Sequence, residues 1–258
     1  MEPVRHIPEI LRNEYTLNEQ IPVYNWYFNE SVQPNTIIWD NQYLQSYIDR
    51  FTFENISNNK HGNENYDGAS LYHINVCKKY INNIQNKDIA VIGTQYPWIE
   101  AILVNAGAKS VTTVEYNVPV CKHNIIKTIS YNDFCKSSNK YDAVFSYSSI
   151  EHSGLGRYGD TLNPNGDIET MEEIYKCLHN NGYCFLGIPV GKDCIVWNAH
   201  RIYGEKRLKM IYLDKFKEIE WIGHNKDYLN TYHEPCENPK WDIQPIIVLQ
   251  KCVTDLTL

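Results

Sequence analysis

The chain has 258 residues, of which 43% are hydrophobic and 21% are charged, and its formal net charge is −7. This composition is typical of a globular protein long enough for one buried core, and it excludes a disordered chain. The acidic balance argues against nucleic-acid binding, because a protein that neutralises phosphates needs a basic surface.

The cysteines and the apolar runs bear on the compartment. Eight cysteines are scattered along the chain, with no C-x-x-C pair and no spacing typical of zinc ligands. Residues 1–6 are not followed by the apolar stretch of a signal peptide, and no run approaches the roughly 20 apolar residues of a membrane span. We therefore expect a soluble, cytoplasmic protein with reduced thiols and no membrane span.

The first part of the chain, residues 1–66, has an irregular pattern. Asn, Gln and Pro interrupt it, and only short apolar runs such as 36–39 and 43–48 appear. We expect an N-terminal extension with one or two short helices, either packed on the core or covering a site as a lid. The polar stretch 58–65 indicates a loop before the regular domain, residues 67–258.

From residue 68 onward, helical spacing alternates with short apolar runs. Helices are predicted over residues 69–84, from Pro97 to a C-terminal cap at Gly107, over 168–178 and over 201–210. Strands are predicted over residues 88–93, 110–115, 125–129, 141–146, 183–188, 218–222 and 246–249. The alternation predicts an α/β fold: a Rossmann-like, doubly wound, seven-stranded and mostly parallel sheet with an antiparallel edge hairpin.

Ligands of such sheets bind at the carboxyl ends of the strands. The first strand is followed by Gly93, Thr94 and Gln95, where a glycine allows the backbone to approach a ligand closely, unless the turn holds no ligand at all. The dinucleotide fingerprint G-x-G-x-x-G is missing, which argues against NAD or FAD.

Glu115 closes the second strand about 20 residues later, where an acid can accept hydrogen bonds from ribose hydroxyls. This spacing favours an adenosine-containing cofactor, although a solvated carboxylate at a strand end would look the same. We expect Tyr116, Tyr131 and Ser146 to complete the cofactor-binding side.

The segment after the fourth strand, residues 146–152, resembles the fourth motif of class I S-adenosylmethionine-dependent methyltransferases. The Asn-Asn-Gly turn at 180–182 and the following run 183–189 are similar to their fifth strand. The loop S-I-E-H-S-G-L-G-R-Y-G-D at 149–160 is similar to a functionally uncharacterised, methyltransferase-like family. Segments 163–167, 187–193 and 197–204 also look like that family.

This resemblance implies S-adenosylmethionine as the cofactor and a methyltransferase-like domain over residues 67–258. The chain departs from the pattern at its first loop, where the usual glycine-rich turn is reduced to Gly93.

Three candidate catalytic residues follow the fourth strand: Glu151, His152 and Asp160. A hydroxyl acceptor needs help to lose its proton at neutral pH, so His152 is the leading base, with a structural histidine bonded to the backbone as the alternative. Glu151 would orient His152, bind the acceptor or stabilise the loop, and Asp160 is a second acid.

The expected acceptor-binding residues are Arg157, Tyr158, His200 and Arg201. The planar fork of Arg157 suits an anionic or polyhydroxyl acceptor. Asp167, just before a predicted helix, is expected to be its N-cap.

A divalent metal on Glu151, His152, Asp160 and His200 is an alternative that no spacing supports, and we expect none. The favoured function is O-methyl transfer to a polar small molecule or glycan, with a sugar hydroxyl as acceptor. A non-catalytic binding protein and an NAD-dependent oxidoreductase remain as alternatives. The sequence does not indicate the oligomeric state.

Overall fold

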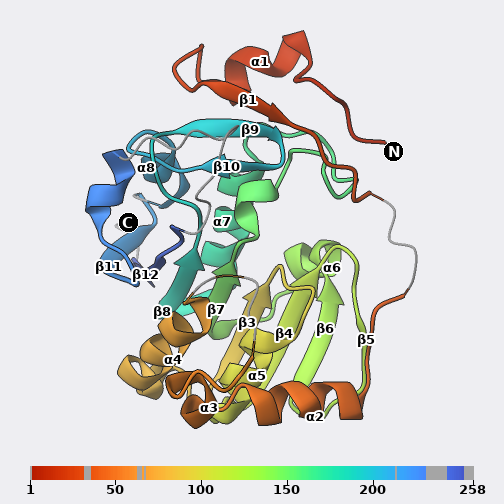
Figure 1. Ribbon diagram of the computed structural model, residues 1–258, viewed down its shortest axis with the longest axis vertical. Coiled ribbons are helices and arrows are strands. Elements are labelled where there is room, and N and C mark those ends of the chain that lie inside the picture. The colour runs from red at the N-terminus through yellow and green to blue at the C-terminus, as the bar shows by residue number, and fades with distance from the viewer. Residues whose placement is uncertain are drawn as a thin grey trace, which may run out of the picture.

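A seven-stranded sheet forms the centre of the computed structural model, which describes residues 2–31, 36–62, 66, 68–212, 214–230 and 243–252 (Figure 1). In spatial order the strands are β11 (Phe216–Ile222), β12 (Ile246–Lys251), β8 (Leu178–Gly187), β7 (Tyr141–Tyr147), β3 (Asp88–Ile92), β4 (Ser110–Glu115) and β6 (Ile126–Ser130). The five strands from β8 to β6 are parallel, whereas β12 is antiparallel to both of its neighbours. The predicted fold class is therefore confirmed.

The strands at the centre of the sheet bury both of their faces, which explains their continuous apolar sequences. In β3, Ile89 and Val91 belong to one hydrophobic cluster, and Ala90 and Ile92 belong to the other. This alternation follows from the two-residue period of a strand. Each cluster requires its own layer of helices.

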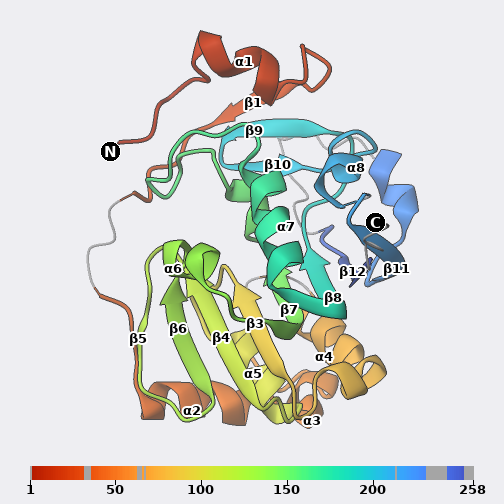
Figure 2. The ribbon, with the colours of Figure 1, turned by 180° about the vertical axis from the view of Figure 1, so that it is seen from behind.

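The helices form those two layers (Figures 1 and 2). One face of the sheet is covered by α4 (Ala69–Lys79) and α5 (Trp98–Asn105), with α2 (Asn41–Arg50) and α3 (Phe53–Ser57) packed outside them. The other face is covered by α6 (Tyr131–Lys136), α7 (Gly166–Cys177) and α8 (Arg207–Tyr212). Three short 3-10 helices complete the helical segments: η1 (Ile81–Asn83), η2 (Ile150–His152) and η3 (Lys226–Asn230).

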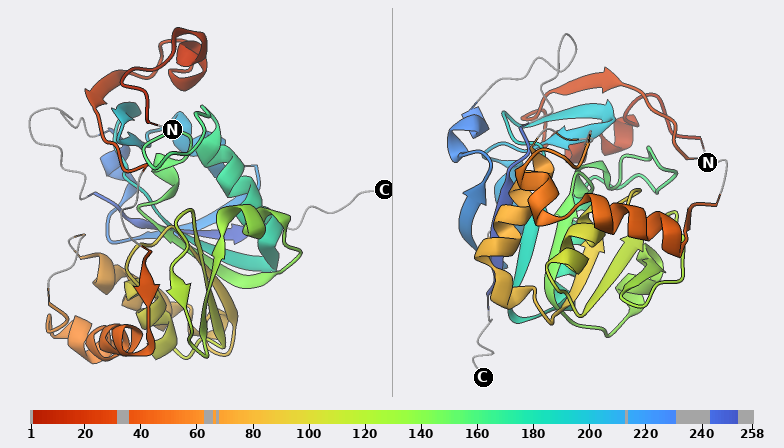
Figure 3. Two further views of the ribbon diagram at one scale, coloured as in Figure 1. Left: turned by 90° about the vertical axis from the view of Figure 1, so that its right-hand side faces the viewer. Right: turned by 60° about the horizontal axis from the view of Figure 1, so that its bottom comes forward.

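The N-terminal segment adds an edge strand to a second, smaller sheet, beside which it lies (Figure 3). After α1 (Glu9–Tyr15), strand β1 (Val23–Trp26) pairs in parallel with β9 (Cys194–Asn198), which pairs with β10 (His200–Ile202). We call residues 23–31 the strap. Further on, β2 (Ile38–Trp39) pairs with β5 (Val120–Cys121). The described residues of the extension thus contain three helices rather than the one or two expected.

The helix predicted over 201–210 is wrong in its first half. Arg201 lies in β10, and α8 begins only at Arg207. The reason is Asp193, whose carboxylate accepts hydrogen bonds from the backbone N–H groups of Gly204 and Arg207, both at 2.9 Å. This interaction satisfies N–H groups at the start of α8 and therefore sets where the helix begins.

Two further expectations concern cysteines and membranes. The described cysteines are free thiols, and Cys236 lies outside the described residues. Within the described part of the chain, no helix combines the length and the apolar character needed to cross a bilayer.

Candidate functional site

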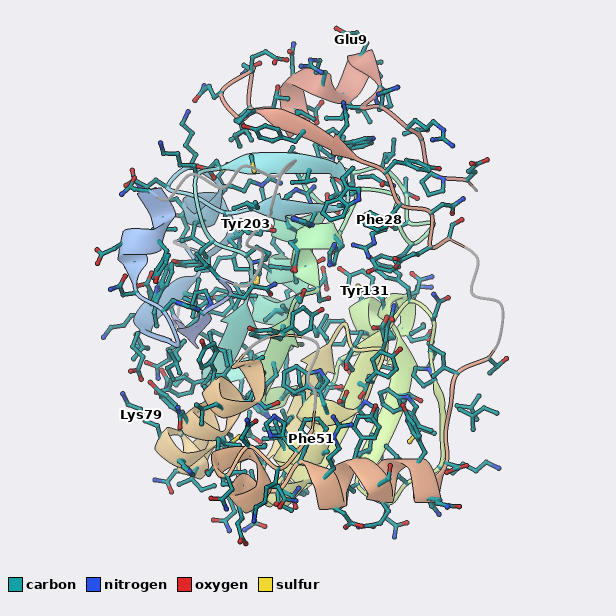
Figure 4. The ribbon with its side chains drawn as sticks, viewed as in Figure 1. Glu9, Phe28, Phe51, Lys79, Tyr131 and Tyr203 are labelled. Atoms are coloured by element: carbon teal, nitrogen blue, oxygen red, sulfur yellow. The ribbon has the colours of Figure 1, made fainter. Side chains whose placement is uncertain are left out.

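A cavity of about 540 Å³ lies where β3, β4 and β7 end. The turn after β3, the end of β4 and the loop after β7 supply its floor, and the strap supplies part of the opposite wall. Phe28 of the strap and Tyr131 of α6 face this region from different sides (Figure 4). The cavity therefore occupies the place where open α/β sheets bind their ligands.

Most of the expected cofactor-binding residues line this cavity together: Gly93, Thr94, Gln95, Glu115, Tyr116 and Tyr131. Ser146 does not line it. Its side chain is buried within β7, below Ser148 and Ser149, which do reach the cavity. The prediction placed the end of β7 too early, because that strand runs on to Tyr147.

Position 93 needs a glycine for two reasons, its backbone conformation and the close packing around it. Its φ of +76° lies in the left-handed region, which disfavours other residues. A Cβ atom at this position would lie only 1.7 Å from the Oγ atom of Ser149. Gly93 therefore lets the loop after β7 pack directly against the turn after β3.

Glu115 is the acid at the centre of the expected cofactor side. Burial raises the pKa of its carboxyl to about 7, and one oxygen accepts a hydrogen bond from the backbone N–H of Tyr116 at 3.0 Å. The rings of Tyr116 and Tyr131 lie 5.2 Å apart beside it. A carboxylate next to a pair of aromatic rings can bind a ligand that carries both hydroxyl donors and a flat ring.

Glu151 and His152 lie on η2, which follows β7, and both line the cavity. The Nδ1 atom of His152 is 2.6 Å from the carbonyl oxygen of Ala199, and its Nε2 atom is 3.7 Å from a carboxyl oxygen of Glu151. Burial lowers the pKa of His152 to about 3, and burial raises the pKa of Glu151 to about 7. At neutral pH the imidazole is therefore uncharged.

Asp160 lines the cavity, but its carboxylate is occupied by the loop. One oxygen accepts hydrogen bonds from the backbone N–H groups of Gly154 at 2.8 Å and Gly156 at 3.2 Å, and the other accepts from that of Tyr158 at 3.3 Å. These contacts hold a turn in which both glycines have positive φ. The carboxylate of Asp160 therefore stabilises this turn, and its catalytic role stays a prediction.

Arg157 joins the loop to the strap. Its guanidinium donates to a carboxylate oxygen of Glu30 at 2.9 Å and lies 4.5 Å from the ring centre of Phe28. The backbone N–H of Glu30 in turn donates to the carbonyl of Arg157 at 2.9 Å. Arg157, Tyr158 and His200 all line the cavity.

Arg201 is not among the residues that line the cavity. It is 2% exposed, and its guanidinium donates to the backbone carbonyls of Ser153 at 2.6 Å and Pro164 at 3.3 Å. Its expected role in acceptor binding is corrected: Arg201 stabilises the loop between β7 and α7, because its guanidinium donates to backbone carbonyls at both ends of that loop.

Asp167 is likewise misassigned as an N-cap, because α7 begins at Gly166 and its N-cap is Asn165. The carboxylate of Asp167 is fully buried and pairs with Arg207 at 2.5 Å, and it also accepts a hydrogen bond from Tyr203 at 3.0 Å. Burial alone would raise its pKa, but the charges of Arg201 and Arg207 hold it below the ordinary value. Asp167 therefore fastens α7 to α8.

Sequence reasoning missed the contribution of the strap, whose Trp26, Phe28 and Glu30 line the cavity. The side chain of Asn198 holds this segment: it accepts from the backbone N–H of Phe28 at 2.8 Å and donates to its carbonyl at 3.0 Å. The cluster of aromatic residues at 24–28 was the one signal in the sequence. Other aromatic lining residues that were missed are Tyr66, Tyr96, Trp98 and Tyr147.

Among the described residues, no group of three or more His, Cys, Asp or Glu side chains could hold a metal ion. The carboxylate of Asp160 is bound to the loop backbone, so the four residues considered from sequence do not form a common ligand set.

A family model described as "Caenorhabditis protein of unknown function, DUF268" matches residues 86–250. The chain belongs to this family. The part of the chain that matches DUF268 contains β3 to β12 and most of the cavity, but it excludes the strap. No curated protein matches the chain.

Several solved structures resemble this DUF268 member. The N-methyltransferase NodS from Bradyrhizobium japonicum in complex with S-adenosylhomocysteine has 10% identity and a TM-score of 0.49, over 83% of this chain and 99% of its own. The 1,6-didemethyltoxoflavin-N1-methyltransferase from Burkholderia thailandensis has 8% identity and a TM-score of 0.49, over 86% of this chain and 94% of its own.

Proposed function

We propose that this protein is a class I S-adenosylmethionine-dependent methyltransferase that methylates a neutral, polar acceptor, with a sugar hydroxyl as the acceptor group. One observation carries the proposal. The acid at the end of β4, Glu115, and the acid–imidazole pair after β7, Glu151 and His152, open into the same cavity at the carboxyl edge of the sheet.

The charges of the cavity suit a sulfonium cofactor better than a dinucleotide. Among the described residues that line it, Arg157 is the only Arg or Lys, and Glu30 already pairs with it. A pyrophosphate would therefore meet no uncompensated cation there, and the single Gly93 offers no phosphate-binding loop. These features weigh against the NAD-dependent oxidoreductase.

Each cofactor-side residue fits a part of S-adenosylmethionine. Glu115 would accept hydrogen bonds from the ribose hydroxyls, Tyr116 and Tyr131 would flank the adenine, and the backbone of 93–95 would hold the amino-acid end. When bound, this cofactor supplies an electrophilic methyl group on a positively charged sulfur.

The acceptor side combines aromatic rings and uncharged hydrogen-bonding groups with the Arg157–Glu30 ion pair. Phe28 and Tyr158 offer ring surfaces, and His152 and His200 are kept neutral because burial lowers their pKa. Such a wall suits a polyhydroxyl ring, which combines apolar C–H faces with hydroxyl groups. We propose that the N-terminal extension, residues 1–66, covers the acceptor side of the cavity as a lid. Residues 67–258 form the methyltransferase domain.

Calorimetric titration with S-adenosylmethionine, with S-adenosylhomocysteine and with NAD as the control tests the cofactor assignment. We expect both sulfur compounds to bind, Glu115→Ala to weaken them by roughly 10-fold or more, and NAD not to bind. The matched control is Glu54→Ala, which removes an exposed acid on α3, outside the cavity. Unchanged affinity in Glu115→Ala contradicts the placement, and binding of neither sulfur compound contradicts the function.

A further inference from the structure

Glu151 is unlike the other acids of the site. It is 0% exposed and lines the cavity, and neither of its carboxyl oxygens has a well-formed hydrogen bond within the described part of the chain, although the Ser148 hydroxyl and nearby backbone N–H groups lower its pKa. By contrast, the carboxylate of Asp167 is paired with Arg207, and that of Asp160 accepts backbone N–H groups. A buried carboxyl that is short of hydrogen bonds is costly, and a ligand that enters the cavity can complete the bonding of Glu151.

The neighbouring histidine is held in one tautomer. A carbonyl oxygen can only accept, so the contact of 2.6 Å between Nδ1 of His152 and the carbonyl of Ala199 places the proton on Nδ1. The Nε2 atom therefore carries a lone pair and lies 3.7 Å from Glu151. Adding a second proton would create a buried cation close to Arg157 and Arg201, whose charges, after burial itself, lower the pKa of His152.

The five charged or titratable groups described next, which lie around Glu151, keep the same charge near neutral pH. Arg157 and Arg201 are cations, and the backbone carbonyl of Glu151 itself accepts from Arg201 at 3.4 Å. His200 from β10 is neutral, because burial lowers its pKa, and Tyr66 and Tyr158 are neutral, because burial raises theirs. Compared with these five groups, Glu151 is the one whose charge changes near neutral pH, because burial raises its pKa to about 7.

We propose that Glu151, rather than His152, is the base that removes the proton from the acceptor hydroxyl, and that His152 is a positioning residue. This inference rests on the proposed function. The acceptor O–H bond breaks and its proton moves to a carboxylate oxygen of Glu151, while the electron pair of the acceptor oxygen forms the new C–O bond to the methyl group. The pair of the broken C–S bond stays on sulfur, and Glu151 later returns its proton to solvent.

The neutral His152 positions the acceptor for this step. Its Nδ1–H holds it on the backbone of Ala199, and its unprotonated Nε2 faces the carboxyl group of Glu151. From there it can accept a hydrogen bond from a second acceptor hydroxyl and so fix the acceptor relative to Glu151.

The first test observes Glu151 without any acceptor. Infrared difference spectra of the full chain with S-adenosylhomocysteine are recorded across pH for the wild type and for Glu151→Gln. We expect a protonated carboxyl band with a midpoint near pH 7 in the wild type, and the share of Glu151 in this band should be missing in the variant, whereas the bands of Glu115 and Glu100 should remain. Asp160→Asn, whose carboxylate is bound to backbone N–H groups, is the control that should keep the band.

The second test measures the transfer of a radiolabelled methyl group from S-adenosylmethionine to methyl α-D-glucopyranoside as the probe acceptor. Glu151→Gln should lose roughly 100-fold or more in kcat while its cofactor affinity stays within about twofold of wild type. His152→Asn should raise KM more than it lowers kcat and should keep the rise of the rate through pH 7. That rise belongs to Glu151, because the base must be ionised to act.

Two results overturn the inference. One is a Glu151 carboxyl that does not titrate between about pH 5 and 9 although the cofactor binds tightly. The other is a Glu151→Gln variant that keeps the wild-type rate and pH profile. Failure of the wild type to bind S-adenosylmethionine is a different failure, because it removes the proposed function and this inference with it.

Discussion

Glu100 of α5 makes the folding stability of this protein depend on pH. Its side chain is fully buried, and one carboxyl oxygen accepts a hydrogen bond from the hydroxyl of Thr113 at 2.7 Å. The other oxygen has no hydrogen-bond partner among the described residues. Burial therefore raises the pKa of Glu100 from 4.5 to about 8, and the folded protein holds this carboxyl in its neutral form at pH 7.

The sign of the effect follows from proton linkage. Above pH 4.5 the unfolded chain releases the proton, whereas the folded chain keeps it until about pH 8, so the free energy of unfolding falls across this interval. At about 1.4 kcal/mol for each pH unit, the loss reaches at most about 5 kcal/mol at pH 8 and is about 3 kcal/mol at pH 6.5. A glutamine cannot ionise and keeps the bond from Thr113, so Glu100→Gln should escape this loss.

Urea unfolding of the wild type and of Glu100→Gln across this pH range gives the measurement. The two free energies should be similar near pH 4.5 and should diverge as the pH rises, with the variant the more stable. Other titrating groups, Glu115 and Glu151 among them, cancel in the difference. Thr113→Val is a useful companion, because loss of its donated bond should extend the divergence to higher pH. Parallel stability curves would refute a neutral Glu100 in the folded protein.

Two further substitutions test the contacts that support the site. Arg207→Met removes the ion pair of Asp167 and leaves that buried carboxylate short of a partner, so the free energy of unfolding should drop by about 3–5 kcal/mol. The control is Lys206→Met, which changes an exposed side chain next to Arg207. An equal loss of stability in both variants would contradict a stabilising role of the ion pair. Asn198→Ala removes both hydrogen bonds to the backbone of Phe28. The rate of amide hydrogen exchange, measured by mass spectrometry, should then rise by roughly 5- to 100-fold in the strap and stay the same in α7. An unchanged rate in the strap would mean that the β1–β9 pairing alone holds this segment.

The central sheet could be predicted because its signal is local. Runs such as 88–92 and 110–115 are apolar or β-branched throughout, and the structure has strands over these same residues. The start of α8 could not be predicted, because it depends on a carboxylate at Asp193 that lies more than ten positions earlier. The spacing of apolar residues along the chain carries no information on a contact between such distant positions.

For the site, the sequence correctly brought together the turn after β3, Glu115 and the loop after β7, since strand ends of a parallel sheet converge. It failed where a charged side chain serves the fold. Arg201 looks like an acceptor-binding residue in sequence and Asp167 looks like a helix N-cap, but both are buried against partners from distant segments. Whether a charged residue faces a cavity or the core depends on packing that neighbouring residues do not reveal.

The strap also has a consequence for the order in which the protein folds. Phe28 and the side chain of Asn198 that holds it are 170 positions apart, and β1 has no other strand partner in the described sheets. During synthesis, the first strand made must therefore wait unpaired until β9 has left the ribosome. Contacts of such high sequence separation carry a large loop-closure cost. The wall above Glu151 can thus form only after β9 has been made, long after the residues of the cofactor side, 93–131, have left the ribosome.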